Sequence, residues 1–473
     1  MENTEPIWRL VEAKQDEFIA LSDRIWDMPE LNFRETRSAR AHAEMLQAEG
    51  FRVTEGLAGI PTAVMGEAGE GGPVIAILGE YDALPGLSQA AGVAEHQPLA
   101  PGAAGHGCGH NLLGAGAMLA AAAVKDWLHS QGIAGRVRYY GCPAEEGGAA
   151  KTFMVRDGVF DDVDIAISWH PAPFAGVNEA NSLAILQIDY AFVGRAAHAA
   201  EAPELGRSGL DAAELMNIGV NYLREHMPSS ARVHYAHLDS GGVAPNVVQA
   251  TTTLRYIVRA ADLPALQTLA SRVDRIAEGA ALMTETTVER RVVSAMSNLL
   301  GNTPLEQAMF DNLRRLGPPP FDAEDRAFAE AIRKTVDRAD VESAHARFGI
   351  ETTDAPLCDR VVPLEARGSG GVGSTDVGDV SWAVPTVQMR GATYAIGTPG
   401  HSWQLTAQGK SPLAHKGMVH AAKTMGGTAV DVLRDQALVE KAKADHRARL
   451  GRTPYVSPLP DGLAPVLGMA DAG

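Results

Sequence analysis

The run Val74-Ile75-Ala76-Ile77-Leu78 constrains the fold most, because it is apolar at every position. A strand of this kind lies in a sheet that is covered on both faces, whereas a strand with one solvent-exposed face alternates apolar and polar residues. Strands and helices alternate around it, and this order predicts an open α/β sheet. The predicted strands are residues 62–65, 74–78, 137–140 and 165–168, and the predicted helices are residues 8–26, 37–49, 111–128 and a segment from about 149.

A second pattern begins near Ser182, where apolar and polar residues alternate along two predicted strands. Together with two helices and a further strand, this block predicts a separate two-layer α+β domain inserted into the first. Its predicted elements are strands at 183–193, 251–258 and 286–293 and helices at 210–226 and 263–282; the first domain resumes with helices at 303–316, 322–339 and 412–433 and a strand at 386–389. The predicted domains are a catalytic domain built from two segments, 1–184 and 298–450, the insert at 185–297 between them, and an extended tail at 451–473.

The composition excludes several classes of partner. The 473 residues carry 41 Lys and Arg against 58 Asp and Glu, a net charge of −17. Such acidity argues against binding to nucleic acid or to an anionic membrane surface, which needs clustered basic residues. Three cysteines are too few for a disulfide framework, and the apolar run 115–124 is too short to span a bilayer. With no signal-peptide pattern, we expect a soluble cytoplasmic protein.

The strongest local signal is His106-Gly107-Cys108-Gly109-His110-Asn111, a glycine-rich loop that precedes a predicted helix. A thiolate and an imidazole two residues apart suit a transition metal. The alternative is a loop cysteine beside a surface histidine, since the spacing is not that of a zinc-finger pair.

Acidic and histidine residues also follow the predicted strands. Glu145 and Glu146 follow one strand, so that one carboxylate can bind a metal while its neighbour moves protons; the alternative is a solvated acidic turn. His170 ends another strand, where a lone histidine is more often a core residue. Cys108, His110, Glu146, His170 and His401 together suit a pair of divalent cations with one bridging ligand, and Glu80-Tyr81-Asp82 ends a further strand.

Five ordered motifs resemble the co-catalytic metallopeptidase and amidohydrolase family, which includes aminoacylases, glutamate carboxypeptidases, N-carbamoyl amino acid hydrolases and auxin-conjugate hydrolases. They are residues 78–89, 105–114, 143–148, 374–382 and 397–404. The resemblance implies a mixed-sheet α/β/α dimetal hydrolase domain with an inserted lid that also dimerises. It also implies two divalent ions, Mn²⁺ or Zn²⁺, held by the five ligands above with Cys108 as the bridge, and Glu145 as general base.

The resemblance also assigns supporting residues. Many relatives carry a His-x-Asp ligand motif where this chain has Glu80-Tyr81-Asp82, so Asp82 becomes a residue behind the ligands. Asn111 stands where auxin-conjugate hydrolases carry Asp after Cys-Gly-His, and Asp376 belongs to the same supporting group. Ser374 and Thr375 lie in a glycine-rich loop, residues 368–379, that we expect to shape the acyl pocket; the alternative is a mobile linker.

The predicted lid carries three further residues of the resemblance. His198 matches the lid histidine that reaches the partner subunit's site and polarises the scissile carbonyl, while Asn246 and Arg259 match positions that bind the substrate α-carboxylate. Without the resemblance, a turn cap for Asn246 and a salt bridge for Arg259 are the simpler interpretations.

The activity that the resemblance implies is hydrolysis of the amide in an N-acyl amino acid, such as p-aminobenzoyl-glutamate, by metal-activated water. Alternatives within the family are an N-carbamoyl or auxin-conjugate hydrolase and a small dipeptidase. Alternatives outside it are an inactive, metal-stabilised binding protein and a thiol enzyme that uses Cys108. The implied partners are a second copy through the lid and a related A subunit.

Overall fold

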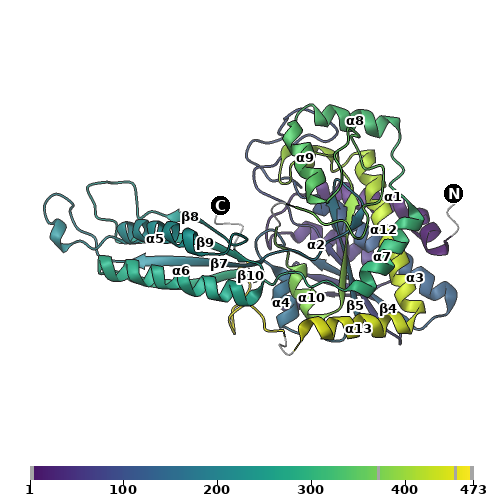
Figure 1. The fold of residues 1–473 in the computed structure, drawn as a ribbon, viewed down its shortest axis with the longest axis horizontal. Helices are drawn as coiled ribbons and strands as arrows, with labels where there is room; N and C mark the ends of the chain where they lie inside the picture. The colour runs from purple at the N-terminus through teal and green to yellow at the C-terminus, as the bar shows by residue number, and fades with distance from the viewer. Residues whose placement is uncertain (1–4, 370–372, 452–454, 469–473) are drawn as a thin grey trace.

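A seven-stranded mixed sheet forms the centre of the computed structural model, which describes residues 5–369, 373–451 and 455–468 (Figure 1). Four neighbouring strands, β4, β3, β5 and β11, run parallel, and antiparallel strands complete both edges. The strand order is β1 (Arg52–Glu55), β2 (Val64–Glu70), β4 (Gly135–Cys142), β3 (Val74–Glu80), β5 (Ile165–Ala172), β11 (Thr386–Ala392) and β6 (Gly176–Val177).

Helices cover both faces of this sheet, as the apolar run predicts. Ile75 and Ile77 of β3 pack into one core, whereas Val74, Ala76 and Leu78 pack into another on the opposite face. This alternation explains why no polar residue is tolerated along the strand. The first face carries α1 (Pro6–Trp26), α2 (Thr36–Ala48), α3 (His110–Gln131), α7 (Thr303–Leu316) and α12 (Pro412–Arg434), and the second carries α4 (Ala150–Arg156) and α10 (Val377–Ala383).

Gly114 lets helix α3 approach the end of β3 closely. A Cβ on Gly114 would lie 2.5 Å from the carbonyl oxygen of Glu80, so a larger residue does not fit there. Gly109, with φ +79°, makes the left-handed turn that leads into the helix. The loop before α3 is thereby held against the carboxyl end of β3.

A four-stranded antiparallel sheet with two helices projects from the main body (Figure 1). The chain enters this projecting unit at Ala184 and leaves it at Met296, and its helices pack against its own strands. The strand order is β10 (Thr287–Met296), β7 (Ala184–Val193), β9 (Thr251–Ala260) and β8 (Arg232–Asp239), and the helices are α5 (Gly209–Leu223) and α6 (Leu263–Thr284).

Some elements differ from the prediction. The helix expected at 322–339 ends earlier than predicted, because α8 spans Ala323–Arg333. A second helix, α9 (Arg338–Arg347), begins after Asp337, which forms a capping box. The prediction missed β8, a mostly exposed edge strand. It also missed α11 (Trp403–Gln408) and α13 (Gln436–Leu450).

The described portion of the predicted tail, residue 451 and residues 455–468, contains neither helix nor strand. Residues 1–4, 370–372, 452–454 and 469–473 lie outside the described residues, as do the portions of the predicted 368–379 loop and 451–473 tail that fall on them. Among the described residues, no helix combines the length and the apolar character needed to cross a membrane.

Candidate metal centre

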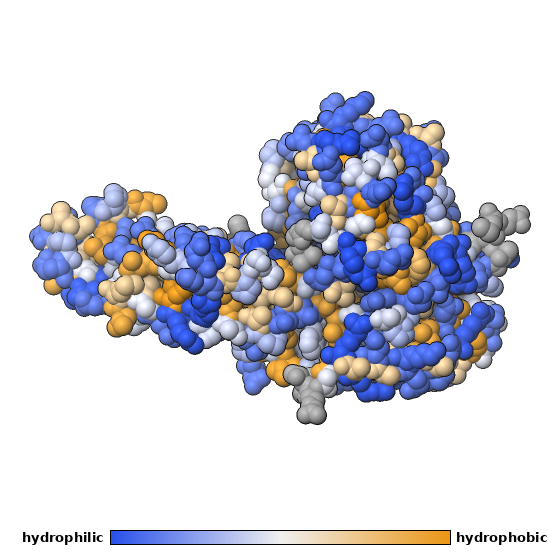
Figure 2. Space-filling view, viewed as in Figure 1, coloured by the Kyte–Doolittle hydropathy of each residue, from blue (hydrophilic) through white to orange (hydrophobic). Residues whose placement is uncertain are grey.

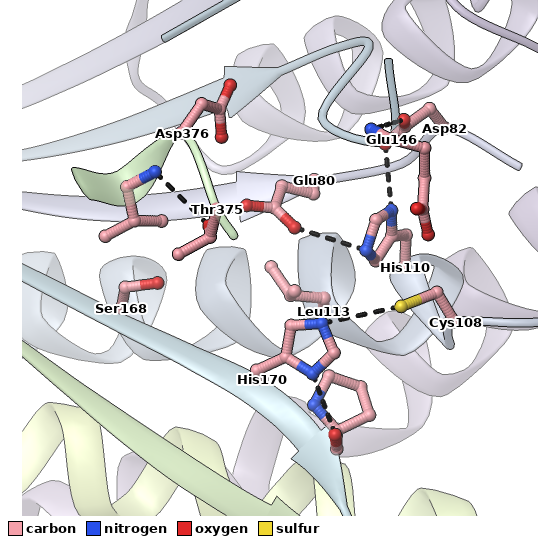
Figure 3. Close-up of polar contacts among 12 residues, drawn as sticks. Glu80, Asp82, Cys108, His110, Leu113, Glu146, Ser168, His170, Thr375 and Asp376 are labelled. Atoms are coloured by element: carbon pink, nitrogen blue, oxygen red, sulfur yellow. Dashed lines mark hydrogen bonds and ion pairs between the residues drawn. The ribbon is translucent and has the colours of Figure 1, made fainter. Parts of the chain in front are cut away.

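The carboxyl ends of three parallel strands meet the loop before α3 at one edge of the sheet. Glu80 ends β3, the pair Glu145 and Glu146 follows β4, and His170 lies near the end of β5. The loop adds Cys108, and α3 begins at His110. Figure 3 shows Glu80, Cys108, His110, Glu146 and His170 turned toward a common space.

The His110 ring is held between two carboxylates, those of Asp82 and Glu80. Its Nδ1 lies 2.8 Å from Asp82 Oδ1, and the other Asp82 oxygen accepts from the backbone N–H of Glu146 at 2.9 Å. Its Nε2 faces Glu80 Oε2 at 3.3 Å (Figure 3). A carboxylate behind the distal nitrogen is the usual support for a metal-binding imidazole. Asp82 therefore lies on the opposite side of the His110 ring from Glu80.

Cys108 joins two groups of potential ligands. Its sulfur lies 3.5 Å from His170 Nε2, while His170 Nδ1 is held by the Pro171 carbonyl at 2.8 Å. One group is Cys108, His110 and His170, and the other is Cys108, Glu146 and His401; within each, the potential ligand atoms all lie within 4.8 Å of one another. A shared Cys108 is the arrangement expected for a thiolate between two neighbouring cations.

His401 completes the second group from a strained turn. Its Nε2 lies 3.3 Å from Glu146 Oε1. The residue has φ +53°, and its backbone N–H donates to the Gly107 carbonyl at 3.0 Å. This contact ties the turn to the loop that carries Cys108, and the left-handed backbone is one that non-glycine residues adopt mainly at functional sites.

The chemistry of these residues fits divalent cations. Among the described residues, His110 Nε2, Glu146 Oε1 and Glu80 Oε2 are buried atoms that make no hydrogen bond of good geometry, and their polar contacts are the ion pairs at 3.3 Å described above. Buried polar atoms of this kind are rare in proteins unless an ion or a water satisfies them. Imidazole, carboxylate and thiolate are also the donors that zinc prefers, and carboxylates admit manganese.

Glu145 lies beside this cluster and shares a third group, within the same 4.8 Å, with Glu80 and His110. Burial raises its pKa well above the usual value, and the charges of Glu80 and Glu146 add to the shift. The turn that carries Glu145 is fixed by Glu35, whose Oε1 accepts from the Ala144 N–H at 2.9 Å. Burial raises the pKa of Glu35 to about 8. Sequence reasoning missed Glu35, for which no local signal exists.

A buried lysine, Lys151, was also missed. Its Nζ lies 2.6 Å from Glu80 Oε1 and 2.6 Å from Asp376 Oδ1, and its backbone N–H donates to the other Asp376 oxygen at 3.0 Å. Asp376 is therefore linked through Lys151 to Glu80 and contacts none of the five predicted ligands in these hydrogen bonds. The available signal was a lysine in the first turn of α4, where a positive charge opposes the helix dipole.

Arg259 of the projecting unit reaches the main body. One guanidinium nitrogen donates to Ser374 Oγ at 2.8 Å. Burial lowers the pKa of Arg259, and the negative charge of Glu145 opposes this shift. Next to Ser374, Thr375 Oγ1 accepts from the Val377 N–H at 3.3 Å. The structure thus brings Arg259, Ser374 and Thr375 to the border of the site.

Other predicted residues lie apart from the cluster. His198 is exposed, and its Nδ1 accepts from the N–H groups of Ala200 and Glu201 at 3.3 and 3.1 Å, which leaves Nε2 as the donor. Asn246 is exposed, and its carbonyl accepts from Ala199 N–H in the same unit. Asn111 lies on a different side of α3 from His110: its amide donates to Ser22 Oγ and the Gly409 carbonyl.

Comparisons with known proteins place the chain in a family. The model of peptidase family M20/M25/M40 matches residues 76–402. The chain is 47% identical over 466 residues to the B subunit of p-aminobenzoyl-glutamate hydrolase from Escherichia coli (strain K12), covering 96% of this chain and 97% of that protein. It is 29% identical to the Xaa-Arg dipeptidase of Mus musculus over 91% and 89% of the two chains.

A solved structure shares the fold. A dinuclear metal-binding peptidase of the M20 family from Bacillus subtilis superposes with a TM-score of 0.57 at 19% identity, covering 89% of this chain and 99% of that one.

Proposed function

The chain belongs to peptidase family M20/M25/M40, and from this premise we propose that it hydrolyses the amide of an N-acyl amino acid with an aromatic acyl group, such as p-aminobenzoyl-glutamate. One observation carries the proposal: two potential ligand groups share Cys108 and lie beside the buried carboxyl group of Glu145. The name of the Escherichia coli relative and its 47% sequence identity to this chain support this substrate class.

Two divalent ions, Zn²⁺ or Mn²⁺, are the proposed cofactors. Cys108, His110 and His170 would hold one, and Cys108, Glu146 and His401 the other. When bound, such ions supply positive charge that polarises a carbonyl and makes a water molecule more acidic.

Glu145 is the proposed general base. It accepts a proton from the attacking water as the water oxygen adds to the amide carbonyl carbon. It then returns that proton to the leaving amine as the C–N bond breaks. A carboxyl group whose pKa is raised by burial is suited to both transfers near neutral pH. The Nε2–H of His198 is a suitable donor to the oxyanion, because its Nδ1 already accepts from backbone N–H groups.

Arg259 and Asn246 are the proposed anchors of the substrate α-carboxylate. The guanidinium donates in a planar fork that matches a carboxylate, and its contact with Ser374 holds it at the border of the site. Ser374 and Thr375 would line the acyl pocket, with Asp82 and Asp376 supporting His110 and Lys151 from behind.

We propose residues 185–297 as a lid that also forms a homodimer, between catalytic segments 1–184 and 298–450, with 451–473 as a tail. Tyr222, Leu282 and Met283 support this, because they are exposed on α5 and α6 (74%, 82% and 66%). Figure 2 shows hydrophobic residues along the projecting unit. A related A subunit is a further proposed partner, because the Escherichia coli relative is itself named as the B component of its enzyme. Three free cysteines support a cytoplasmic location.

A substrate panel tests the activity. The purified protein, loaded with Mn²⁺ or Zn²⁺, is incubated with p-aminobenzoyl-glutamate, N-acetyl amino acids, indole-acetyl-aspartate and β-alanyl dipeptides. We expect release of p-aminobenzoate that stops with a chelator and returns with metal. Preferred cleavage of dipeptides would instead favour a dipeptidase, and activity that resists the chelator would favour a thiol enzyme. No hydrolysis of any compound would favour a binding protein.

A further inference from the structure

Arg390 lies on the same wall of the site as His170. The strands β11 and β5 are parallel neighbours, and Arg390 is the register partner of His170. Register partners on adjacent strands project to the same face of a sheet. Val387 and Met389 pack into the core on the α3 side, so Arg390 projects to the opposite face, as His170 does opposite Trp169.

One corner of the Arg390 guanidinium is fixed in place. Its Nε donates to Asn178 Oδ1 at 2.8 Å. Asn178 is itself held by two hydrogen bonds to Gln388: its backbone N–H donates to the carbonyl at 2.8 Å, and its amide donates to Oε1 at 2.7 Å. The guanidinium is therefore oriented before any ligand arrives, which reduces the entropy lost on binding.

The charge of Arg390 has no anionic partner in the described residues of the chain. None of the ion pairs found there includes Arg390, although the residue is only partly exposed. Burial lowers its pKa, and the positive charge of Arg347 lowers it further, whereas Tyr394, Cys108 and Glu145 act in the opposite sense. A partly buried cation with a free donor fork is costly unless an anion pairs with it.

We propose that Arg390 binds the side-chain carboxylate of a dicarboxylic amino acid in the substrate. This inference rests on the proposed function and adds to it, since Arg259 of the projecting unit takes the α-carboxylate there. Two arginines on separate walls, one beside Ser374 and one beside His170, match the two carboxylates of glutamate or aspartate. The enzyme then selects acidic amino acids over their neutral analogues.

An isosteric change at Asn178 tests the proposal with little effect on packing. Asn178→Asp keeps the oxygen that accepts from Arg390 Nε and loses the amide that donates to Gln388 Oε1, a hydrogen bond that Gln388 restores by turning its own amide N–H toward the carboxylate. The variant gives the guanidinium a carboxylate of its own, which competes with the substrate. The readout is kcat/KM for p-aminobenzoyl-glutamate and for its neutral isostere p-aminobenzoyl-glutamine. We expect the preference for glutamate to fall about 10- to 100-fold in Asn178→Asp and in Arg390→Gln. In both variants kcat/KM falls more for the glutamate compound than for the glutamine compound, whereas Arg338→Gln, at an exposed arginine in other ion pairs, leaves the preference intact.

Calorimetric titration of the metal-loaded protein with free glutamate and free glutamine gives an independent readout. We expect wild type to bind glutamate more tightly than glutamine and Arg390→Gln to bind the two alike. A wild-type protein without that preference, or variants that lose both substrates equally, would overturn the role of Arg390. If no acyl amino acid is hydrolysed but the Arg390-dependent preference in binding is present, the proposed activity fails while the carboxylate site stands.

Discussion

The Nζ of Lys151 lies 2.6 Å from Glu80 Oε1, and both side chains are buried beneath the candidate metal centre. Asp376 makes a second contact of the same length, so one cation offsets two carboxylates away from water. Removing one partner of such a buried cluster leaves an unpaired charge in the interior. The resulting loss of stability is larger than the net stability that the intact cluster contributes.

Lys151→Met should therefore lower the free energy of unfolding by about 3–5 kcal/mol. Denaturant unfolding of the metal-free protein measures this loss without interference from metal binding. Lys423→Met, at a half-buried lysine that pairs with the exposed Glu12, is the matched control and should cost less than Lys151→Met, because its partner stays in contact with water. Equal effects of the two substitutions would contradict the compensating role of Lys151.

Asp82→Asn should weaken metal binding by roughly 10- to 100-fold, because the carboxylate that holds His110 Nδ1 is lost while the ligands remain. Competition with a chromogenic chelator gives the affinity. Asp161→Asn, at a surface position, should leave it unchanged. Wild-type affinity in Asp82→Asn would show that His110 is held by the packing of α3 alone.

Glu145→Gln should retain the metal and the fold but lose turnover by about 10²- to 10⁴-fold, the usual contribution of a positioned proton-transfer group. Metal content and thermal unfolding are measured alongside hydrolysis. A variant with near wild-type turnover would exclude Glu145 as the base.

Mixed dimers test whether His198 acts in the partner's site. His198 is exposed, and its polar contacts in the described chain are with its own loop. We expect His198→Ala and Glu145→Gln to be inactive as homodimers. Co-expressed and purified as heterodimers, they should recover up to about half of the wild-type activity per dimer, because one of the two sites then holds both residues. Heterodimers that stay inactive would contradict a shared site.

The sequence predicts those site residues that immediately follow a recognisable strand or lie in a short loop next to one. The strand β3 is recognisable because it is apolar on both faces, and His170 and the Glu145–Glu146 turn follow strands of the same sheet. The edge strand β8 lacks this signal, because most of its residues are exposed. Asn111 follows His110 on α3, but adjacent helix residues point about 100° apart, and its amide binds α1 instead. Lys151 and Arg390 acquire their roles only through partners distant in sequence.

Stability should also fall below pH 6.5 because of His42, a buried histidine whose ring packs against Tyr81. Its Nδ1 lies 2.8 Å from the Ser38 carbonyl, and its buried Nε2 has no partner among the described residues. Burial lowers the pKa of His42 from 6.5 to about 4. Between these values the unfolded chain binds the proton and the native one does not, so the stabilisation is complete above pH 6.5 and is lost as the pH falls toward 4.

At pH 5 this effect amounts to about 2 kcal/mol. Denaturant unfolding at pH 7 and pH 5 should therefore show a loss of stability on acidification that is about 2 kcal/mol smaller in His42→Gln than in wild type. The same substitution at the exposed His129 is the matched control. An identical loss in wild type and His42→Gln would mean that His42 is already protonated in the native protein, in which case its Nε2 must have an acceptor.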